Sequence, residues 1–557
     1  MLRRTINKIN QIHRDMKMKA ISKECNSLEK NGKTILFAYC FLVYDRCKYH
    51  DFLLAQSLKK RGCKIVPLIC GGVQDRECSV YGGAWGNKSE DETLKIKQHK
   101  QNCAKCIRCD KQVWKTWSGY DCILAKDEIE DKEKNDIREY VEQLDIQNYK
   151  EWTYKGYPIG RWAWLTYCDM YLVSKVSVID EHFVKNFKSF AINVIMMVIS
   201  TEKVCDRVKP DIIYSNDSFY YPFCIAEYIA LERNIPFYNA YGLNKDTYSY
   251  AYNVSTIKAE LSDAWEGYKN YELTDQEYKF ICNYVKGRKS GQAMTINTAD
   301  PRAIIKDVKA DAIIGKIDKK KKTTLLATNV SWDAAALGKE IQFESMQDWV
   351  METVCFFEKH SEWQLIVRSH PAEKADIIPE TKEQVVPMIL QYYSNNLPNN
   401  IILIPADADI SSYDLFDDIS VGLVYTSTIG LEMVSAGIPV MTSGSSPYYN
   451  KGFTYDTNTK EEYFQILSYL MTYDVEKDKI EEYRMQALKF FYLYHFKYMI
   501  PNYWFSHTYG KQGVKLKIKS GKELFPSHNP VLDYICDSII EGKPIISKDR
   551  MIPYNVV

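Results

Sequence analysis

The chain has 557 residues, a length that corresponds to roughly three domains or fewer. It carries 73 Lys and Arg against 72 Asp and Glu, and this balance excludes the strongly basic surface of a dedicated nucleic-acid binder. No apolar run approaches the ~18–20 residues of a membrane helix, and the basic N-terminus lacks the apolar segment of a secretory signal. We therefore expect a cytoplasmic protein whose 16 cysteines are reduced thiols or metal ligands.

The first predicted unit is strand, helix and strand. Residues 34–43 and 63–70 are short apolar runs, and residues 50–61 have the apolar spacing of a helix that ends at Gly62. Elements of these lengths predict two parallel strands joined by a right-handed crossover. Residues 71–150 then interrupt the rhythm, and we expect them to form an insertion.

A cluster of cysteines lies at the start of this insertion. Five cysteines occur within 40 positions, and the last three form the pattern Cys-x-x-Cys-x-x-Cys: Cys70, Cys78, Cys103, Cys106 and Cys109. Thiolates three residues apart can share one metal ion when a tight turn brings them together, so one prediction is a structural zinc site or an iron–sulfur cluster. Unligated thiols are the alternative. No His or carboxylate with ligand spacing joins the cluster, so any metal here is expected to be structural.

The alternation of strands and helices resumes after the insertion. Residues 211–215, 222–233 and 235–240 predict a second strand–helix–strand unit. A polar stretch that ends in four consecutive lysines, at position 322, is expected to link two domains. Beyond it the pattern starts again, with strands predicted at 322–328, 364–368, 400–404, 421–425 and 438–441 and helices at 342–359, 428–436 and 460–472.

This alternation indicates an α/β protein with two doubly wound, parallel sheets. We expect an N-terminal domain over 1–315, a C-terminal domain over 322–480, and an aromatic helical tail over 481–557. The tail is expected to brace the N-terminal domain; the alternative is that it lies on a membrane surface. Because ligands of such sheets bind outside the carboxyl ends of the strands, the site should use loops that follow strands and face a central cleft.

A histidine follows one of these strands, in the run Arg368-Ser369-His370-Pro371. The proline restricts the residue before it to an extended conformation, so His370 is expected to face the cleft, where an imidazole suits a phosphate oxygen. A structural histidine is the alternative. Arg368 is expected either to add positive charge to the site or to turn inward on its strand.

Three hydroxyl side chains follow another strand and open a helix: Thr426, Ser427 and Thr428. Backbone N–H groups at the start of a helix favour an anion, and short hydroxyls add donors without blocking its approach. Glu432 lies one turn into this helix, where a carboxylate can accept hydrogen bonds from ribose. A capped helix with Glu432 as capping-box partner is a second interpretation, and it is compatible with the first.

A general base would require a carboxylate at a strand end that faces the cleft. Asp217, just after the predicted strand 211–215, meets this requirement and could act on an acceptor hydroxyl. An Asx turn that closes the same loop is the alternative.

Together these motifs resemble the capsule polysaccharide biosynthesis protein family. The resemblance covers about 325–475 well and the N-terminal half only in rhythm, and it is carried by Tyr449 and by residues 328–333, 367–373, 424–432, 437–440 and 452–456. It implies the GT-B fold, in which two Rossmann-like domains face a central cleft. The members that transfer Kdo carry a Glu-Asp-Gly segment after an N-domain strand, whereas positions 239–242 read Asn-Ala-Tyr-Gly here.

The resemblance further implies a bacterial glycosyltransferase that needs no metal or other cofactor for catalysis. Its partners would be a nucleotide-sugar donor, such as CMP-Kdo or another CMP- or UDP-sugar, and a capsule polysaccharide or lipid-linked glycan acceptor at the inner face of the plasma membrane. His370 and Asp217 are then the predicted catalytic residues, and the predicted donor-binding residues are Asn329, Arg368, His370, Thr426, Ser427, Thr428 and Glu432. A CDP-glycerol-type glycerophosphotransferase and a catalytically silent GT-B partner in an assembly complex are the alternative functions.

Overall fold

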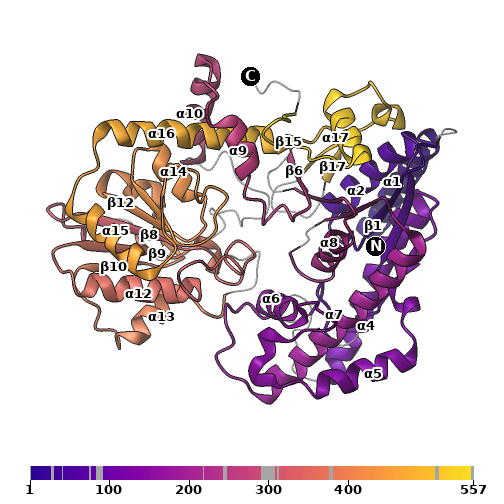
Figure 1. Cartoon of the computed structure of the whole chain (residues 1–557), viewed down its shortest axis with the longest axis horizontal. Helices are drawn as coiled ribbons and strands as arrows, with labels where there is room; N and C mark the ends of the chain where they lie inside the picture. The colour runs from indigo at the N-terminus through magenta and orange to yellow at the C-terminus, as the bar shows by residue number, and fades with distance from the viewer. Residues whose placement is uncertain are drawn as a thin grey trace.

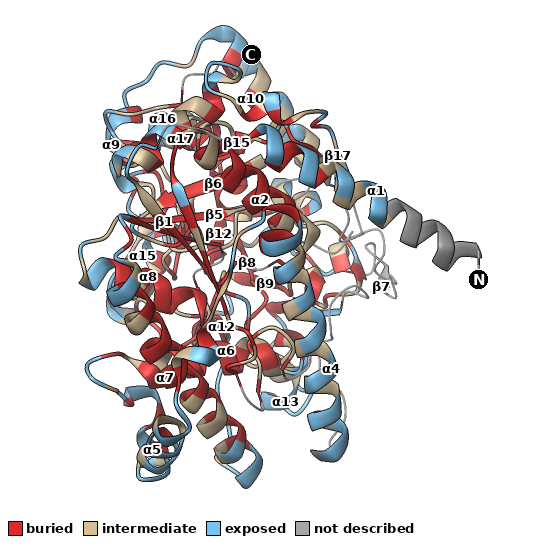
Figure 2. Ribbon diagram, turned by 90° about the vertical axis from the view of Figure 1, so that its right-hand side faces the viewer, coloured by how far each residue is buried: buried red, intermediate tan, exposed pale blue. Residues whose placement is uncertain are grey.

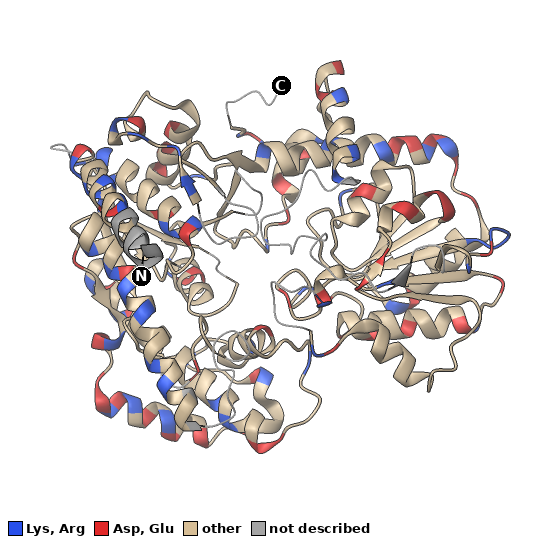
Figure 3. Ribbon diagram, turned by 180° about the vertical axis from the view of Figure 1, so that it is seen from behind, with Lys and Arg blue, Asp and Glu red and all other residues tan. Residues whose placement is uncertain are grey.

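The computed structural model describes residues 2–26, 30–40, 42–74, 77–82, 92–216, 219–242, 247–289, 308–309, 313–374, 381–507 and 514–552. These residues form two lobes, each built around its own β-sheet (Figure 1). Lys and Arg are interspersed with Asp and Glu over the helices of both lobes, as the near-zero net charge implies (Figure 3).

The N-terminal lobe contains a seven-stranded sheet with the order β15-β6-β5-β4-β1-β2-β3. The strands are β1 (Thr34–Ala38), β2 (Lys64–Ile69), β3 (Ile123–Leu124), β4 (Ile212–Ser215), β5 (Phe237–Tyr241), β6 (Thr247–Tyr252) and β15 (Met499–Pro501). The five strands from β5 to β3 are parallel, whereas β6 and β15 add to the edge in antiparallel orientation. The predicted parallel pairing of the first two strands is therefore confirmed.

Helices cover both faces of this sheet, because its strands are apolar on both sides. Along β1, Phe37 points into a core shared with α2 (Asp45–Lys60) and α17 (Pro530–Glu541). Its neighbour Leu36 points into the opposite core, which is formed with α6 (Ile159–Tyr171), α7 (Glu181–Val208) and α8 (Phe223–Glu232). Figure 2 shows these helix faces and strands as a continuous buried interior.

The helix that contains the apolar run at 190–200 is much longer than that run. It spans 28 residues as α7. Among the described residues it is the one helix whose length and apolar composition would allow it to cross a membrane, and 72% of its most apolar 18-residue stretch is buried inside the protein. Its burial against the sheet makes it a core helix of the N-terminal lobe.

The C-terminal lobe contains a six-stranded, fully parallel sheet with the order β10-β9-β8-β12-β13-β14. The strands are β8 (Thr323–Ala327), β9 (Gln364–Arg368), β10 (Ile401–Ile404), β12 (Val421–Val424), β13 (Val440–Thr442) and β14 (Tyr455–Asp456). Leu326 of β8 faces a core with α12 (Met346–Glu358), α13 (Val385–Tyr392) and α15 (Lys460–Thr472). Leu325 faces the other core, with α14 (Ile429–Ser435) and α16 (Lys477–Tyr492).

The chain enters the C-terminal lobe earlier than predicted. Two helices that precede residue 315, α9 (Ser262–Tyr268) and α10 (Asp275–Lys289), belong to the core of this lobe. The indole of Trp265 packs 5.4 Å from the ring of Phe490 and 5.9 Å from that of Phe453. The predicted boundary at 315 is therefore wrong, because the polar run that ends at 322 is not the place where the chain changes lobes.

The end of the chain returns to the N-terminal lobe. After α16, the chain passes through a π-helix (Leu493–Tyr498) into β15, a β16–β17 hairpin (Phe505–His507 and Val514–Leu516) and α17, all beside the first sheet (Figure 1). The aromatic side chains of this region are mostly buried in one lobe or the other, including Phe490, Phe491 and Phe505 with no exposed surface. They do not form the exposed apolar face that membrane binding would require.

Candidate functional site

The loops that follow β8, β9 and β12 meet at the carboxyl edge of the C-terminal sheet. The backbone N–H of His370 donates to the Thr328 hydroxyl at 3.0 Å, and the backbone N–H of Thr426 donates to the Asn329 side-chain oxygen at 3.2 Å. Both acceptors come directly after β8, the strand between β9 and β12. The end of β8 therefore links the loop that contains His370 to the loop of Thr426, Ser427 and Thr428, called the hydroxyl loop below.

His370 is held in one protonation state by the turn that follows it. Pro371 opens a 3₁₀ turn (Pro371–Lys374), and the backbone N–H of Ala372 donates to His370 Nδ1 at 3.1 Å. Because Nδ1 accepts, the proton of the neutral ring lies on Nε2, which can donate to a ligand. Burial and the nearby Arg368 charge lower the pKa of His370 from 6.5 to about 4. The ring is therefore a neutral hydrogen-bond donor at pH 7.

Arg368 turns inward, the second of its two predicted orientations. Its guanidinium donates to the backbone carbonyls of Pro405 and Ile410, and only 4% of the residue is exposed. Burial lowers the pKa of Arg368 to about 10. The predicted donor-binding role is corrected to a supporting one, in which Arg368 holds the loop after β10 close to the histidine turn.

The hydroxyl loop divides into a structural and an open part. Thr426 is 6% exposed, and its hydroxyl donates to the backbone carbonyl of Ala335. The hydroxyls of Ser427 and Thr428 are half-buried, and within the described structure they form no hydrogen bond. The capping interaction considered for Thr428 is not formed. Ser427 and Thr428 are therefore the two hydroxyls that can donate to a ligand.

Glu432 is a buried ion-pair partner. Arg288 of α10 donates from Nε to one carboxylate oxygen at 2.5 Å, and the Tyr413 hydroxyl donates to the other. With 1% of the residue exposed, neither oxygen is open to ribose. The predicted ribose role and the predicted capping box are both corrected to an anchor between α10 and α14. Sequence reasoning missed Arg288 because it lies 144 residues away in an unremarkable helix.

The predicted general base, Asp217, lies outside the described residues. Its neighbour Asn216 belongs to a buried polar network that sequence reasoning missed. The Asn216 amide donates to Asp51 at 2.5 Å, Tyr214 donates to the same carboxylate at 2.6 Å, and His50 Nδ1 lies 3.0 Å from it. This network ties α2 to the carboxyl end of β4. A His-Asp pair inside a predicted helix was the signal that could have revealed it.

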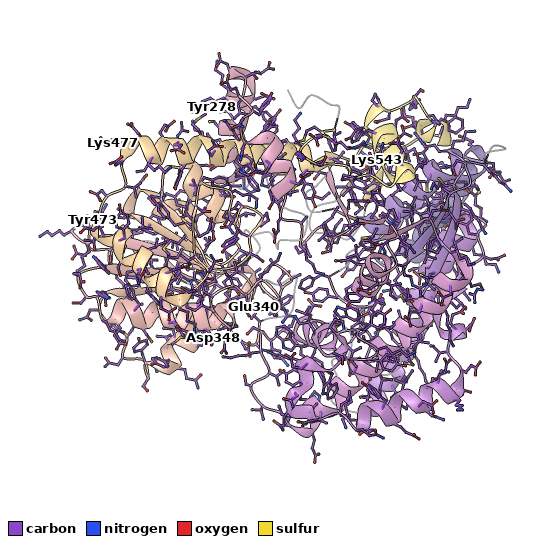
Figure 4. All side chains as sticks on the ribbon, in the orientation of Figure 1. Tyr278, Glu340, Asp348, Tyr473, Lys477 and Lys543 are labelled. Atoms are coloured by element: carbon purple, nitrogen blue, oxygen red, sulfur yellow. The ribbon has the colours of Figure 1, made fainter. Side chains whose placement is uncertain are left out.

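Polar contacts also join the two lobes. The backbone N–H and hydroxyl of Ser174 both donate to Glu383, at 2.9 and 2.8 Å. Two ion pairs accompany them, Lys175 with Asp348 at 3.4 Å and Arg161 with Glu340 at 3.5 Å. Glu340 and Asp348 lie on the side of the C-terminal lobe that faces the N-terminal lobe (Figure 4). These contacts place the site at the boundary between the lobes.

One pocket lies away from this site. Its volume is about 470 Å³, and it is formed by residues of α5 (Asp131–Glu142) and the last two turns of α7, with Tyr154 and Lys155. The end of α7 leads into the amino end of β4. The pocket is therefore at the opposite edge of the N-terminal sheet from the strand ends that carry the predicted residues.

The predicted cysteine cluster adopts a different local structure from the one assumed. Cys103, Cys106 and Cys109 lie within one helix, α4 (Glu92–Lys111), so their spacing of three follows a helix turn instead of a tight loop. Burial raises the pKa of Cys78 to about 12 and also raises that of Cys70, so these thiols are protonated. No group of three possible ligands among the described residues is placed to hold a metal ion. The zinc or iron–sulfur site stays a prediction, which elemental analysis of the purified protein would test.

Two doubly wound domains, joined at a boundary that carries the candidate site, define the α/β class that was predicted, the GT-B arrangement. Residues 234–472 match the sequence model of the capsule polysaccharide biosynthesis protein family. The resemblance carried by the motifs is thus confirmed over these residues. No curated protein matches the chain.

Several solved structures are similar to this chain. The Thermosulfurimonas dismutans KpsC β-Kdo 2,4-transferase is 13% identical, with 49% of this chain and 78% of that chain covered and a TM-score of 0.30. The β-Kdo 2,7-transferase of the same KpsC is 13% identical over 51% of this chain and 79% of that one, with a TM-score of 0.28. The Streptomyces sp. SF2575 glycosyltransferase SsfS6, complexed with thymidine diphosphate, is 8% identical over 82% and 95%, with a TM-score of 0.24.

Proposed function

We propose that this protein is a glycosyltransferase that transfers a sugar from a nucleotide-activated donor to a capsule or other surface polysaccharide acceptor, without a catalytic metal. The observation that carries the proposal is His370, a neutral ring whose Nε2 proton is available at the carboxyl edge of the C-terminal sheet. At the same sheet edge, after β12, lie the hydroxyls of Ser427 and Thr428, which have no hydrogen-bond partner among the described residues. The family match over residues 234–472 supports the assignment to capsule synthesis.

In the proposed reaction, the bond between the anomeric carbon and the donor phosphate breaks as a bond to an acceptor hydroxyl oxygen forms. Negative charge accumulates on the departing phosphate, and hydrogen bonds from His370 Nε2, Ser427 and Thr428 stabilise it. The proton of the acceptor hydroxyl passes to a base, for which Asp217 stays the prediction. CMP- and UDP-linked sugars are the proposed donors.

A nucleotide-binding experiment tests this proposal. Melting temperatures would be measured with CMP, CDP, UDP and GDP, and the dissociation constant of the best ligand would be compared between the wild type and His370→Ala. Loss of one hydrogen bond to a charged phosphate should weaken binding by about 10–100-fold. His360→Ala is the matched control, because His360 lies at the amino end of the same strand and should leave binding unchanged.

Three results would contradict the proposal at different levels. If none of the four nucleotides raised the melting temperature, the donor class would be wrong. If His370→Ala bound as tightly as the wild type, the site would be wrong. If nucleotides bound but no sugar from CMP- or UDP-linked donors reached a polysaccharide acceptor, the catalytically silent partner would be the correct function.

A further inference from the structure

A lysine that the proposed reaction does not use is buried between the two lobes. Lys339, in the loop after β8, is 8% exposed, and its ammonium donates to the backbone carbonyl of Ile257 at 2.9 Å. Ile257 lies in the segment that leads from β6 of the N-terminal lobe to α9 of the C-terminal lobe. An ammonium has three N–H donors, and within the described structure one of the three is engaged.

The backbone of Lys339 forms part of the rim of the candidate site. Its carbonyl accepts a hydrogen bond from the N–H of Ser445 at 3.0 Å. A Cβ atom added to Gly444 would lie 3.1 Å from that carbonyl and 2.9 Å from the Thr426 side chain. The lysine therefore originates where the loops after β8, β12 and β13 pack together, next to the open hydroxyls of Ser427 and Thr428.

The residue before this lysine packs against the N-terminal lobe. A Cβ atom on the preceding residue, Gly338, would lie 3.3 Å from the Arg161 guanidinium and 3.5 Å from the Phe219 ring. With its ammonium on Ile257, Lys339 therefore lies at the boundary between the two lobes.

The charges around Lys339 do not neutralise it. Burial lowers the pKa of Lys339 to about 8, an effect that Glu260 and Glu340 oppose and Lys258 reinforces. Glu340 is paired with Arg161 and accepts from the backbone N–H of Gly338, and Glu260 is exposed. A buried ammonium with two unengaged donors and no ion pair among the described residues is placed to receive an anion.

We propose that Lys339 is the cation that binds the phosphate of the nucleotide ligand, together with the hydroxyls of Ser427 and Thr428. This inference rests on the proposed function and deepens it, because it names the charged group that recognises the donor phosphate.

A second buried lysine provides a matched control. Lys451 is 7% exposed, and its ammonium donates to the hydroxyl of Ser262, the first residue of α9, at 3.0 Å and to the Tyr449 carbonyl at 2.8 Å. With two acceptors in place, Lys451 has a structural role. Replacement of Lys451 should affect stability without affecting anion binding.

The test uses inorganic pyrophosphate as the probe and the full-length protein. Isothermal titration would compare the wild type with Lys339→Met, Lys339→Arg and Lys451→Met, each checked for its melting temperature. We expect Lys339→Met to weaken pyrophosphate binding at least tenfold, Lys339→Arg to restore most of it, and Lys451→Met to leave it unchanged. Equal binding by Lys339→Met and the wild type would overturn the inference, as would a wild type that binds no pyrophosphate.

A second measurement needs no variant and stays informative if Lys339→Met does not fold. At pH 8.5 the wild-type protein would be acetylated with and without pyrophosphate, and each lysine would be quantified by mass spectrometry. Pyrophosphate should reduce the modification of Lys339 at least fivefold and leave that of Lys451 unchanged. Equal modification of Lys339 in both samples would overturn the inference.

Failure of this inference can be told apart from failure of the proposed function. If pyrophosphate bound through Lys339 while no nucleotide bound, the lysine site would stand and the donor assignment would fall. If nucleotides bound equally to the wild type and Lys339→Met, the nucleotide site would stand and the role of Lys339 would be overturned.

Discussion

At the scale of single residues, the candidate site depends on groups whose hydrogen bonds are set by the adjoining backbone. The Ala372 N–H selects the tautomer of His370. The two residues after β8, Thr328 and Asn329, accept hydrogen bonds from the backbone of His370 and of Thr426. Predicting His370 was possible because a His-Pro pair after an apolar strand constrains the local conformation. Its protonation state was not predictable, because it follows from burial and from a distance of 3.1 Å.

The depressed pKa of His370 should make the stability of the protein depend on pH. The folded-state pKa is about 4 against an ordinary value of 6.5, so the unfolded chain binds the proton first as the pH falls. We expect this group to cost about 1–3 kcal/mol of unfolding free energy as the pH falls from about 6.5 to about 4. Urea unfolding at pH 7 and pH 4.5 would show a smaller loss for His370→Gln; an equal loss in both proteins would refute this.

The Arg288–Glu432 pair should contribute to stability through burial. In Glu432→Gln, the Arg288 guanidinium stays buried without its counter-charge, so the free energy of unfolding should fall by about 3–5 kcal/mol. Denaturant unfolding would measure this loss. Glu482→Gln is the control, because loss of the exposed Lys479–Glu482 pair should leave the free energy of unfolding nearly unchanged. If both variants lost the same small free energy of unfolding, the Arg288–Glu432 pair would not anchor α10 to α14.

At the scale of helices and strands, the local sequence pattern predicted some element bounds correctly and missed others. The helix Lys460–Thr472 was predicted with its observed bounds, and in the structure a capping box of Thr459 and Glu462 fixes its start. The first strand ends at Ala38, five residues before the end of the apolar run 34–43, because Tyr39 adopts a positive φ of 53°. A left-handed residue ends a strand, and apolar composition does not report it.

Gly430 should be required where α14 begins. A Cβ atom there would approach Val424 to 2.8 Å and would overlap the hydroxyl of Tyr448, which donates to the Ser427 carbonyl. We expect Gly430→Ala to lower the free energy of unfolding by about 1–3 kcal/mol through overpacking. It should also weaken nucleotide binding, because the hydroxyl loop shifts. Chemical denaturation and titration would check both, and a variant with unchanged values would refute the close approach.

At the scale of the whole molecule, the described chain crosses between the lobes twice. These crossings couple the stability of one lobe to that of the other. It passes into the C-terminal lobe before α9 and returns after α16, and the polar contacts of Ser174 with Glu383 add a third connection. The candidate site therefore sits at a boundary formed by segments far apart in sequence, which is where an enzyme with two substrates can bind one on each lobe.

The returning tail should stabilise the N-terminal lobe. Phe505 has no exposed surface and packs against Tyr49 and Tyr248, whereas its near neighbour Tyr503 is 48% exposed. We expect Phe505→Ala to lower the free energy of unfolding by about 3–5 kcal/mol and Tyr503→Ala by no more than about 0.5 kcal/mol. Guanidinium unfolding of the two variants would test this, and similar small losses would mean that the tail does not brace the lobe.

The sequence by itself determined the α/β class, the two doubly wound domains and the strand ends that carry His370 and residues 426–428, because strand alternation and turn chemistry are local properties. Only the tertiary structure decided which groups are free to bind. Glu432 and Arg368 are engaged by residues distant in sequence, and Lys339 is left with unengaged donors at the lobe boundary. The reason is physical: desolvation and partner choice depend on three-dimensional neighbours, which no spacing along the chain encodes.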